Sequence, residues 1–381
     1  MDKVINAAII GYGYMGRFHQ RKLAGTKGVI LTGVFDTDPN RSDEATVEGL
    51  TVYETAEDLF NDPAIDLVLI CTPNDSHAAY AIAALAKGKH VMCEKPVTMN
   101  AKELEDVICA AVASGRKFTT HQNRRWDRDF LAVKKVAESR NIGSPTTIES
   151  KVFGQRGVCF GWRALPEHGG GMLMDWGVHL IDQALLMLEG HRVISVRARL
   201  MSILTPAVDD YFELSLRFDN QMEYHITVGT FALQPQPRWF MHGDRGTLKI
   251  DTFDPHTASM KRIKQDVRGF DSVFEKEHLG PSRTMAPLKP EFIEELVMPI
   301  TEDLSHEYHR NLVAAINGQE ELHVRWDQML HVMHIIDLAK ESSKKNTVLL
   351  TQNLYKDGGY EKLFGGLYGI RRSKPASKRA V

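Results

Sequence analysis

Three ionisable side chains follow a run of glycines in the stretch GGGMLMDWGVHLID, residues 169–182. Residues three and four apart share one face of a helix, so Asp175, His179 and Asp182 are predicted to form a single polar stripe. A neutral histidine can accept a proton near neutral pH, and a nearby carboxylate can hold it or orient a hydroxyl group. The pattern is compatible with proton transfer, with a metal site and with a satisfied core histidine, and spacing alone leaves these alternatives open.

A lysine occupies a constrained position in the stretch CEKPVT, residues 93–98. Pro96 keeps Lys95 out of the helical region and can adopt a cis bond, so the direction of the ammonium group is restricted. Most lysines are solvated surface charges. This one follows a predicted strand at the edge where a cofactor would lie, which favours a role in stabilising negative charge on a substrate oxygen.

The hexapeptide GYGYMG follows an apolar run and opens a helical pattern. Gly11 permits a tight turn, Gly13 lets the backbone approach a pyrophosphate, and Gly16 allows close helix packing, with Tyr14 and Met15 at the helix start. Asp36 ends the next predicted strand, where a carboxylate can accept hydrogen bonds from ribose hydroxyls and would repel a 2′-phosphate. The motif predicts NAD as cofactor.

Other residues near the same predicted edge are weaker cofactor candidates. Arg41 is close enough in sequence to reach a 2′-phosphate, which leaves NADP open. In CTPNDSH, Thr72, Pro73 and Asn74 could bind the cofactor or simply shape the turn. His77 heads the next helix pattern, where capping or facing the cofactor is favoured over catalysis.

The elements that position these residues follow an alternating pattern. Strands are predicted at 4–10, 28–35, 65–72, 89–94 and 117–121, with helices near 15–24, 55–61, 76–87 and 100–114. Alternation of this kind is typical of a parallel sheet with crossover helices. The carboxyl ends of its strands meet at one edge, which collects the glycine motif and Lys95.

Beyond residue 145 the pattern becomes that of consecutive antiparallel strands. Strands are predicted at 193–202, 211–218, 222–231 and 238–250, with a turn at 243–246, and helices at 178–189, 305–317 and 326–345. One sheet face could be covered by the 178–189 helix, and the other is expected to be apolar and to form a subunit interface. Residues 251–304 show no sustained period and are predicted to be loop with short elements.

Composition excludes several classes of protein. The 381 residues are 43% hydrophobic and 25% charged, with 47 basic and 49 acidic residues and a formal charge of −2, so attraction to nucleic acid is not expected. The chain shows no export signal and no membrane-spanning apolar run. Its four cysteines show no CxxC pairing, which favours reduced thiols and a cytoplasmic setting.

Taken together, GYGYMGRFH, CTPNDSHAAYAIAALAKGKHVMCEKP, HQNRRWD, GWRALPEHGGGMLMDWGVHLID and the β-rich second half closely resemble the Gfo/Idh/MocA family of NAD(P)-dependent oxidoreductases. The resemblance implies an α/β protein with a Rossmann domain at 1–123. It also implies an α+β domain with an open, mostly antiparallel sheet at 124–350. The tail, 351–381, lies outside the resemblance and is predicted to be a flexible terminus.

The resemblance also assigns site residues. Lys95 matches the lysine of the E-K-P motif that begins at Glu94, and Asp175 and His179 match the acid and histidine of the D-x-G-x-H motif. Asp182 matches an acidic position that follows the D-x-G-x-H motif. It is predicted to support the site residues or to cap the helix. Four further residues match family positions that line the cofactor or the substrate, and the resemblance implies the same role here: Asn123, Arg125, Trp162 and Arg163.

The predicted function is oxidation of a ring hydroxyl of a sugar, sugar derivative or cyclitol such as inositol, in a homodimer or homotetramer joined through the second sheet. Relatives that recycle NAD while cleaving glycosides offer one alternative, since the same residues serve that cycle. A non-catalytic NAD-sensing protein is the other. It is disfavoured because a binder needs no proton acceptor facing the nicotinamide.

Overall fold

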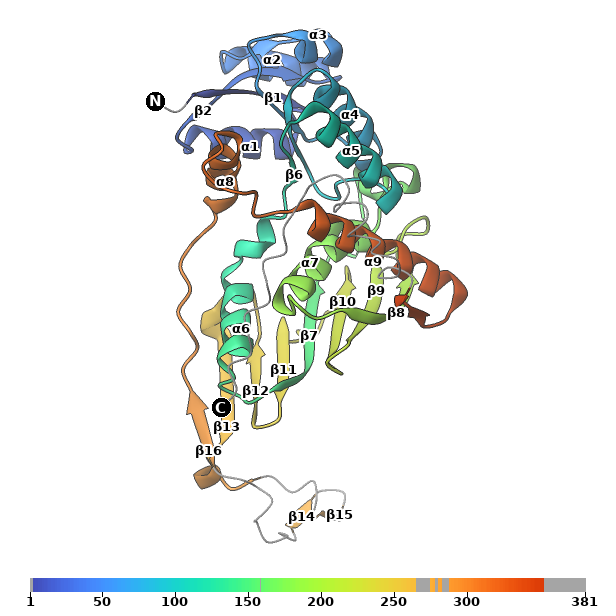
Figure 1. Cartoon of the computed structure of the whole chain (residues 1–381). Helices are drawn as coiled ribbons and strands as arrows, with labels where there is room; N and C mark the ends of the chain where they lie inside the picture. Colours follow the sequence, from blue (N-terminus) through green and yellow to red (C-terminus); the bar gives the residue numbers. More distant parts are fainter. Residues whose placement is uncertain (1–2, 158, 265–274, 278–279, 283–287, 353–381) are drawn as a thin grey trace.

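Six parallel strands form the first sheet, in the order β3-β2-β1-β4-β5-β6, in a computed structural model that describes residues 3–157, 159–264, 275–277, 280–282 and 288–352 (Figure 1). The strands are β1 Ile5–Ile10, β2 Val29–Phe35, β3 Thr51–Val52, β4 Leu67–Ile70, β5 His90–Cys93 and β6 Phe118–Thr120. The helices are α1 Tyr14–Ala24, α2 Pro39–Val47, α3 Ala56–Asn61, α4 His77–Ala86 and α5 Ala101–Ser114. This confirms the predicted Rossmann-type sheet.

Local sequence explains most of these elements. β1 and β4 are buried almost throughout, as apolar strands covered on both faces are. Side chains of Asp38, Thr55 and Asn100 accept backbone hydrogen bonds at the starts of α2, α3 and α5. The sequence prediction missed α2 and β3, because α2 buries only Ala45 and β3 is two residues long.

The second sheet has nine strands in the order β16-β13-β12-β11-β7-β10-β9-β8-β17. They are β7 Pro145–Phe153, β8 Val193–Met201, β9 Tyr211–Phe218, β10 Glu223–Gly229, β11 Trp239–Gly243, β12 Gly246–Ile250, β13 Ala258–Ile263, β16 Ile293–Leu296 and β17 Leu349–Leu350. Only β7 and β10 pair in parallel, so the sheet is mostly antiparallel, as predicted. Strands β14 Glu275–Glu277 and β15 Gly280–Ser282 form a separate hairpin.

Three helices lie against one face of the second sheet: α6 Arg128–Ser139, α7 Val178–Met187 and α9 Trp326–Lys345 (Figure 1). Trp239 of β11 donates a hydrogen bond to Asp129 of α6, and Ser342 of α9 accepts one from the backbone of Ala198 in β8. The helix predicted over 178–189 is observed as α7, which ends at Met187 and contacts β10. The helix at 326–345 is confirmed with its predicted bounds.

One prediction about the second sheet was incomplete and one was wrong. Residues 251–304, predicted to be loop with short elements, contain two short strands, β13 and β16, that extend one end of the sheet; both carry charged residues that obscure the alternating pattern. The outward face was expected to be apolar, but its central rows are polar, because the alternating apolar residues turn toward the helices. These rows contain Glu149, Lys151, Glu213, Ser215, His225 and Thr227.

Helix α8, Glu307–Ile316, returns from the second sheet to the first (Figure 1). Val313 lies beside Gly28 at the start of β2, and His309 forms a hydrogen bond with His19 of α1. The chain then continues to α9 on the second sheet. Helix α8 therefore completes the first structural unit, although most of the second unit precedes it in the chain.

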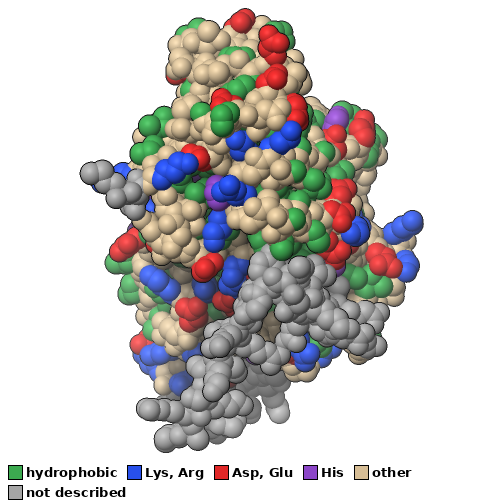
Figure 2. All heavy atoms as spheres, turned by 45° about the horizontal axis from the view of Figure 1, so that its top comes forward, with side chains coloured by type: hydrophobic (Ala, Val, Ile, Leu, Met, Phe, Trp, Pro, Cys, Tyr) green, Lys and Arg blue, Asp and Glu red, His purple; other side chains and the backbone are tan. Residues whose placement is uncertain are grey.

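Surface features of the described residues are unexceptional. Lys and Arg side chains are interspersed with Asp and Glu over the face drawn in Figure 2. No helix in the described ranges combines the length and apolar character needed to cross a membrane. All four cysteines are free thiols: Cys71, Cys93, Cys109 and Cys159. The predicted tail lies outside the described residues from position 353 onward.

Candidate active site

The glycine loop between β1 and α1 has the geometry of a dinucleotide site. Gly11 has φ +88°, and a Cβ there would lie 2.8 Å from the Cys71 backbone. A Cβ on Gly16 would lie 2.3 Å from the Gly11 carbonyl oxygen, whereas one on Gly13 would meet no atom within 4 Å. No side chain caps the start of α1. Open space beside Gly13 and uncapped amide groups at Tyr14 and Met15 fit a bound pyrophosphate.

Asp36 is held in place at the end of β2. Its two carboxylate oxygens accept hydrogen bonds from the backbone of Tyr12, at 2.6 Å, and of Asp38, at 2.8 Å. Arg41 pairs with Glu44 at 3.1 Å and with Asp38 at 3.9 Å. A 2′-phosphate would therefore meet a fixed carboxylate and an arginine whose charge is already compensated, which suits NAD better than NADP.

The loop after β4 offers the cofactor a buried acceptor. Asn74 is 2% exposed, and its amide nitrogen donates to the Gly169 carbonyl oxygen at 3.0 Å. Its oxygen Oδ1 has no hydrogen-bond partner within the described residues. Pro73 precedes it, and the Thr72 hydroxyl forms a hydrogen bond with Ser76 at 2.6 Å. A buried acceptor without a partner fits a ligand that donates from hydroxyl groups, as NAD does.

His77 does not face the cofactor, which corrects its assignment to that group. It is fully buried, with Nδ1 2.8 Å from the Pro96 carbonyl oxygen and Nε2 2.9 Å from that of Thr72. Both ring nitrogens lie within hydrogen-bonding distance of backbone carbonyl oxygens, and a neutral imidazole can donate to one of the two. The residue fastens the loop after β4 to the loop that carries Lys95.

Lys95 and Asp175 form the centre of the site. The Lys95 ammonium donates to Asp175 Oδ1 at 2.6 Å and to the Asp175 carbonyl oxygen at 2.9 Å, and the Lys95–Pro96 peptide is cis. Arg163 Nε lies 3.5 Å from the same carboxylate oxygen and stacks 4.4 Å from the centre of the Trp162 ring. Burial raises the pKa of Asp175, but Lys95 and Arg163 outweigh it and hold the pKa below its ordinary value.

His179 is fixed in one orientation by Gln122. The Gln122 amide nitrogen donates to the Val178 carbonyl oxygen at 3.3 Å, so its oxygen is the atom that accepts from His179 Nδ1 at 3.0 Å. This assigns the proton of neutral His179 to Nδ1 and leaves the lone pair on Nε2. Burial, followed by the charges of Lys95 and Arg124, holds the pKa of His179 well below its usual value. The imidazole is therefore neutral and can act as a proton acceptor.

Asp175 and His179 come from different helical geometries. Asp175 lies in a π-helical turn, η5 Leu173–Gly177, and His179 lies in the first turn of α7. The three residues of the predicted stripe each bind a different partner: Asp175 binds Lys95, His179 binds Gln122, and Asp182 binds Arg125. π-Helical turns are frequent at functional sites.

Arg125 is a structural residue, which corrects its assignment as a substrate ligand. It is 6% exposed and forms a bidentate pair with Asp182, with Nε and Nη2 donating at 2.7 and 2.5 Å. Its Nη1 donates to the His323 carbonyl oxygen and to Gln328 of α9. Asp182 thus acts behind the site, as predicted, by joining α7 to the segment before α6.

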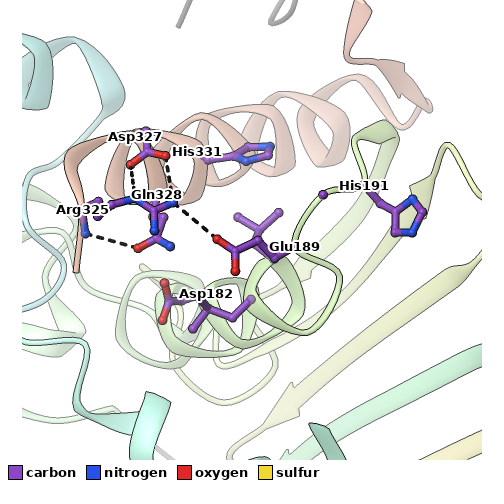
Figure 3. Close-up of a pocket in the computed structure, with 10 residues that line it drawn as sticks. Asp182, Glu189, His191, Arg325, Asp327, Gln328 and His331 are labelled. Atoms are coloured by element: carbon purple, nitrogen blue, oxygen red, sulfur yellow. Dashed lines mark hydrogen bonds and ion pairs between the residues drawn. The ribbon is translucent and has the colours of Figure 1, made fainter. Parts of the chain in front are cut away.

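A pocket of about 130 Å³ lies beyond this pair, between α7 and α9 (Figure 3). Asp182 and Gln328 point toward each other across it, and Arg325 pairs with Asp327 and Glu189 at its rim. These charged groups of the pocket are therefore paired with other groups of the protein. Lys95 and His179 do not line this pocket.

The carboxylate of Glu94 faces a histidine cluster, which corrects its assignment to the cofactor. One oxygen accepts from His19 Nε2 and His121 Nδ1, both at 2.8 Å, and the other accepts from the Lys95 backbone at 3.1 Å. His19 Nδ1 lies 2.9 Å from His309 Nε2. Burial raises the pKa of Glu94, but His121 and His19 outweigh it and hold the pKa well below its usual value. Burial lowers the pKa of His19 to about 4 and that of His309 to about 2.

This cluster was not predicted, because its members come from α1, the end of β6 and α8. Ligand nitrogens of His19, His121 and His309 lie within 4.8 Å of one another, a spacing from which a metal ion could be held. In the structure they are joined by hydrogen bonds to each other and to Glu94. A metal ion could bind only by replacing those bonds.

Further residues beside the site were also missed. Arg124 stacks on Trp176, and Gln122 orients His179, yet neither stands out in HQNRRWD. The two adjacent arginines of that stretch, Arg124 and Arg125, show that positive charge lies nearby. The sequence does not show which of them faces the candidate site. Asn123, predicted to line the cofactor, is exposed at the start of the 3₁₀-helix η2 Asn123–Trp126.

Comparisons with known proteins agree with the fold of the two sheets. Residues 5–122 match a family model described as "Oxidoreductase family, NAD-binding Rossmann fold", and residues 130–249 match the GFO/IDH/MocA C-terminal domain. An uncharacterized oxidoreductase, YdgJ of Escherichia coli, is 32% identical over 92% of this chain and 99% of its own length. The scyllo-inositol 2-dehydrogenase (NADP(+)) IolW of Bacillus subtilis is 28% identical over 91% of this chain and 96% of its own length. A solved NAD-binding protein from Listeria innocua is 36% identical, with a TM-score of 0.88 over 91% of this chain and 99% of its own.

Proposed function

The chain belongs to the Gfo/Idh/MocA family of NAD-binding oxidoreductases, and from this premise we propose that it oxidises a ring hydroxyl of a sugar, sugar derivative or cyclitol such as inositol. The observation that supports the proposal best is the ion pair of Lys95 with Asp175 at the carboxyl edge of the first sheet, together with His179, four residues beyond Asp175, whose pKa the Lys95 charge helps to lower. A relative of similar length is named for action on scyllo-inositol, which favours a polyol.

The proposed chemistry divides between cofactor and protein. Bound NAD would supply the hydride acceptor. His179 takes the hydroxyl proton on Nε2, since Gln122 occupies Nδ1. The Lys95 ammonium stabilises negative charge that develops on the substrate oxygen, and Asp175 holds that ammonium while orienting a neighbouring hydroxyl.

NAD is the proposed physiological cofactor rather than NADP. The fixed Asp36 carboxylate accepts hydrogen bonds from ribose hydroxyls and disfavours a 2′-phosphate, while Glu44 compensates the charge of Arg41. The steady-state ratio of kcat/KM for the two cofactors tests this preference. A ratio that favours NADP would contradict it.

The experiment that tests the reaction follows absorbance of reduced nicotinamide while the purified protein and NAD meet inositols, aldoses, sugar acids and simple glycosides. Net NADH formation with a polyol supports the proposal. Release of an aglycone without net NADH would replace it with NAD-recycling glycoside cleavage. Tight NAD binding without turnover of any compound would indicate a sensing protein.

We also propose a homodimer or homotetramer joined through the outward face of the second sheet, in the cytoplasm. On that face Glu149 and Lys151 form an ion pair at 2.6 Å, and Ser215 bonds His225, so it presents both signs of charge to a second copy. The exposed thiol of Cys109 suits a reducing compartment. A monomer in analytical ultracentrifugation, over the concentration range of the assay, would contradict the assembly.

A further inference from the structure

Arg124 lies against a pair of neighbouring aromatic rings beside the proposed proton-transfer residues. Its guanidinium carbon is 4.1 Å from the centre of the Trp176 ring and 5.6 Å from that of Phe253. Trp176 directly follows Asp175, and its ring centre lies 6.4 Å from that of His179. The stacked guanidinium therefore belongs to the surroundings of the candidate active site.

One edge of this guanidinium is free to bind a ligand. Within the described residues, only Nη1 of Arg124 has a hydrogen-bond partner, Asp127 at 2.9 Å. Trp176 stacks on the guanidinium, and the N–H bonds of Nε and Nη2 lie in the plane of the group, where stacking leaves them available for hydrogen bonds. The side chain is 27% exposed, so water or a ligand can reach it.

Arg125 shows which ligand fits such an edge. Its Nε and Nη2 bind the two oxygens of the Asp182 carboxylate at 2.7 and 2.5 Å. The same pair of nitrogens is free on Arg124. Because a planar carboxylate matches this fork, the geometry favours a carboxylate over a hydroxyl group as the partner.

Three cations lie near the candidate site. Lys95 and Arg163 share the carboxylate of Asp175, and Arg124 pairs with Asp127. Besides burial, Lys95 and Arg124 both lower the pKa of His179, which shows that their fields reach the proton acceptor. A ligand anion beside Arg124 would reduce that field.

We propose that Arg124 binds the carboxylate of an acidic polyol, so that the preferred substrate is a sugar acid rather than a neutral sugar or cyclitol. This inference rests on the proposed function and narrows its substrate class. Lys95, Asp175 and His179 remain for the hydroxyl group that is oxidised. Trp176 positions Arg124 by stacking beneath it.

The test compares matched compounds that differ only in the acidic group: D-glucuronate with D-glucose, D-galacturonate with D-galactose, and D-glucose 6-phosphate as a second anion. NADH formation gives kcat/KM for each in the wild type and in Arg124→Gln, Arg124→Lys and Arg128→Gln. Arg128 is an exposed arginine at the start of α6 and serves as the matched control. Calorimetric titration of each NADH-loaded protein with glucuronate and glucose measures binding independently of turnover.

We expect a uronate-to-sugar ratio of at least about 10 in the wild type, because charge-assisted hydrogen bonds discriminate by about 10- to 100-fold. The ratio should fall to about one in Arg124→Gln, recover in part in Arg124→Lys and stay unchanged in Arg128→Gln. Equal ratios in the wild type and Arg124→Gln would overturn the inference, and so would preference for the phosphate over the uronate.

The two proposals fail differently. Turnover of neutral polyols with no preference for uronates would overturn the inference and leave the proposed function standing. If neither these compounds nor the inositols and other polyols of the wider panel yield NADH, the proposed function fails, and the calorimetric arm still decides the inference. Binding of glucuronate by the wild type and its loss in Arg124→Gln would support a carboxylate site, whereas equal binding by both would refute it.

Discussion

Acidification should destabilise the protein through the buried cluster of His19, His121, His309 and Glu94, and His19 allows the effect to be calculated. Its pKa is about 4 in the folded protein against an ordinary value of 6.5. Above pH 6.5 the residue is neutral in both states and has no effect. Below that, the unfolded chain takes up a proton that folded His19 does not, so the free energy of unfolding falls by about 1.4 kcal/mol per pH unit.

The expected loss from His19 alone is therefore about 2 kcal/mol at pH 5 and about 3 kcal/mol near pH 4. His309 acts with the same sign, since its pKa is lowered to about 2. Glu94 acts in a separate window, because its stabilisation is present above its ordinary pKa and is lost as the pH falls further. A loss of this size is a large fraction of the stability of a typical domain.

The assay is urea unfolding of the wild type and His19→Gln at several pH values between 7.5 and 5. The glutamine can still donate to Glu94 but does not titrate, so the difference in stability between the two proteins should shrink by about 2 kcal/mol over this range. His256→Gln, at an exposed position, serves as the control and should run parallel to the wild type. Parallel lines for wild type and His19→Gln would refute the reasoning.

Other substitutions should separate the roles of individual residues. Lys95→Ala should lower kcat by about 10³-fold while a fluorescence titration shows NADH binding retained, because the ammonium acts on the reacting oxygen; wild-type turnover would remove it from the mechanism. Gln122→Leu should lower kcat by about 10- to 100-fold in steady-state assays, since His179 loses the partner that fixes its tautomer. Asp36→Ala should weaken NAD binding more than NADP binding in parallel titrations, and an unchanged preference would contradict its assignment. Arg125→Leu should lower the free energy of unfolding by about 3 to 5 kcal/mol in urea, because it leaves a buried carboxylate unpaired.

Features with a strong local signal could be predicted from the sequence. The glycine loop, the five longer strands of the first sheet and α9 all follow from apolar periodicity and turn residues within a short window. The meeting of Lys95 with Asp175 was implied by family resemblance, and the structure brings them within 2.6 Å. Strands β13 and β16, at one end of the second sheet, were not assigned from the sequence because few of their residues are buried.

Features that depend on tertiary partners could not be predicted. Arg124 and Arg125 are identical in type and adjacent in sequence, yet one is stacked and partly exposed while the other is buried against Asp182. Nothing local distinguishes them, because the distinction arises from α7 and α9. His77 and Glu94 similarly lie at the edge where a cofactor belongs, but their side chains are buried, with the His77 ring beside the Pro96 carbonyl oxygen and the Glu94 carboxylate bound to His19 of α1.

The return of α8 to the first sheet has a consequence for the newly made chain. His309 enters the ribosome exit tunnel 290 residues after His19, its hydrogen-bond partner. Until then an emerging Rossmann unit has His19, Glu94 and His121 without the helix that covers them. Folding of this enzyme during synthesis therefore cannot proceed strictly domain by domain, because the unit made first becomes complete among the last.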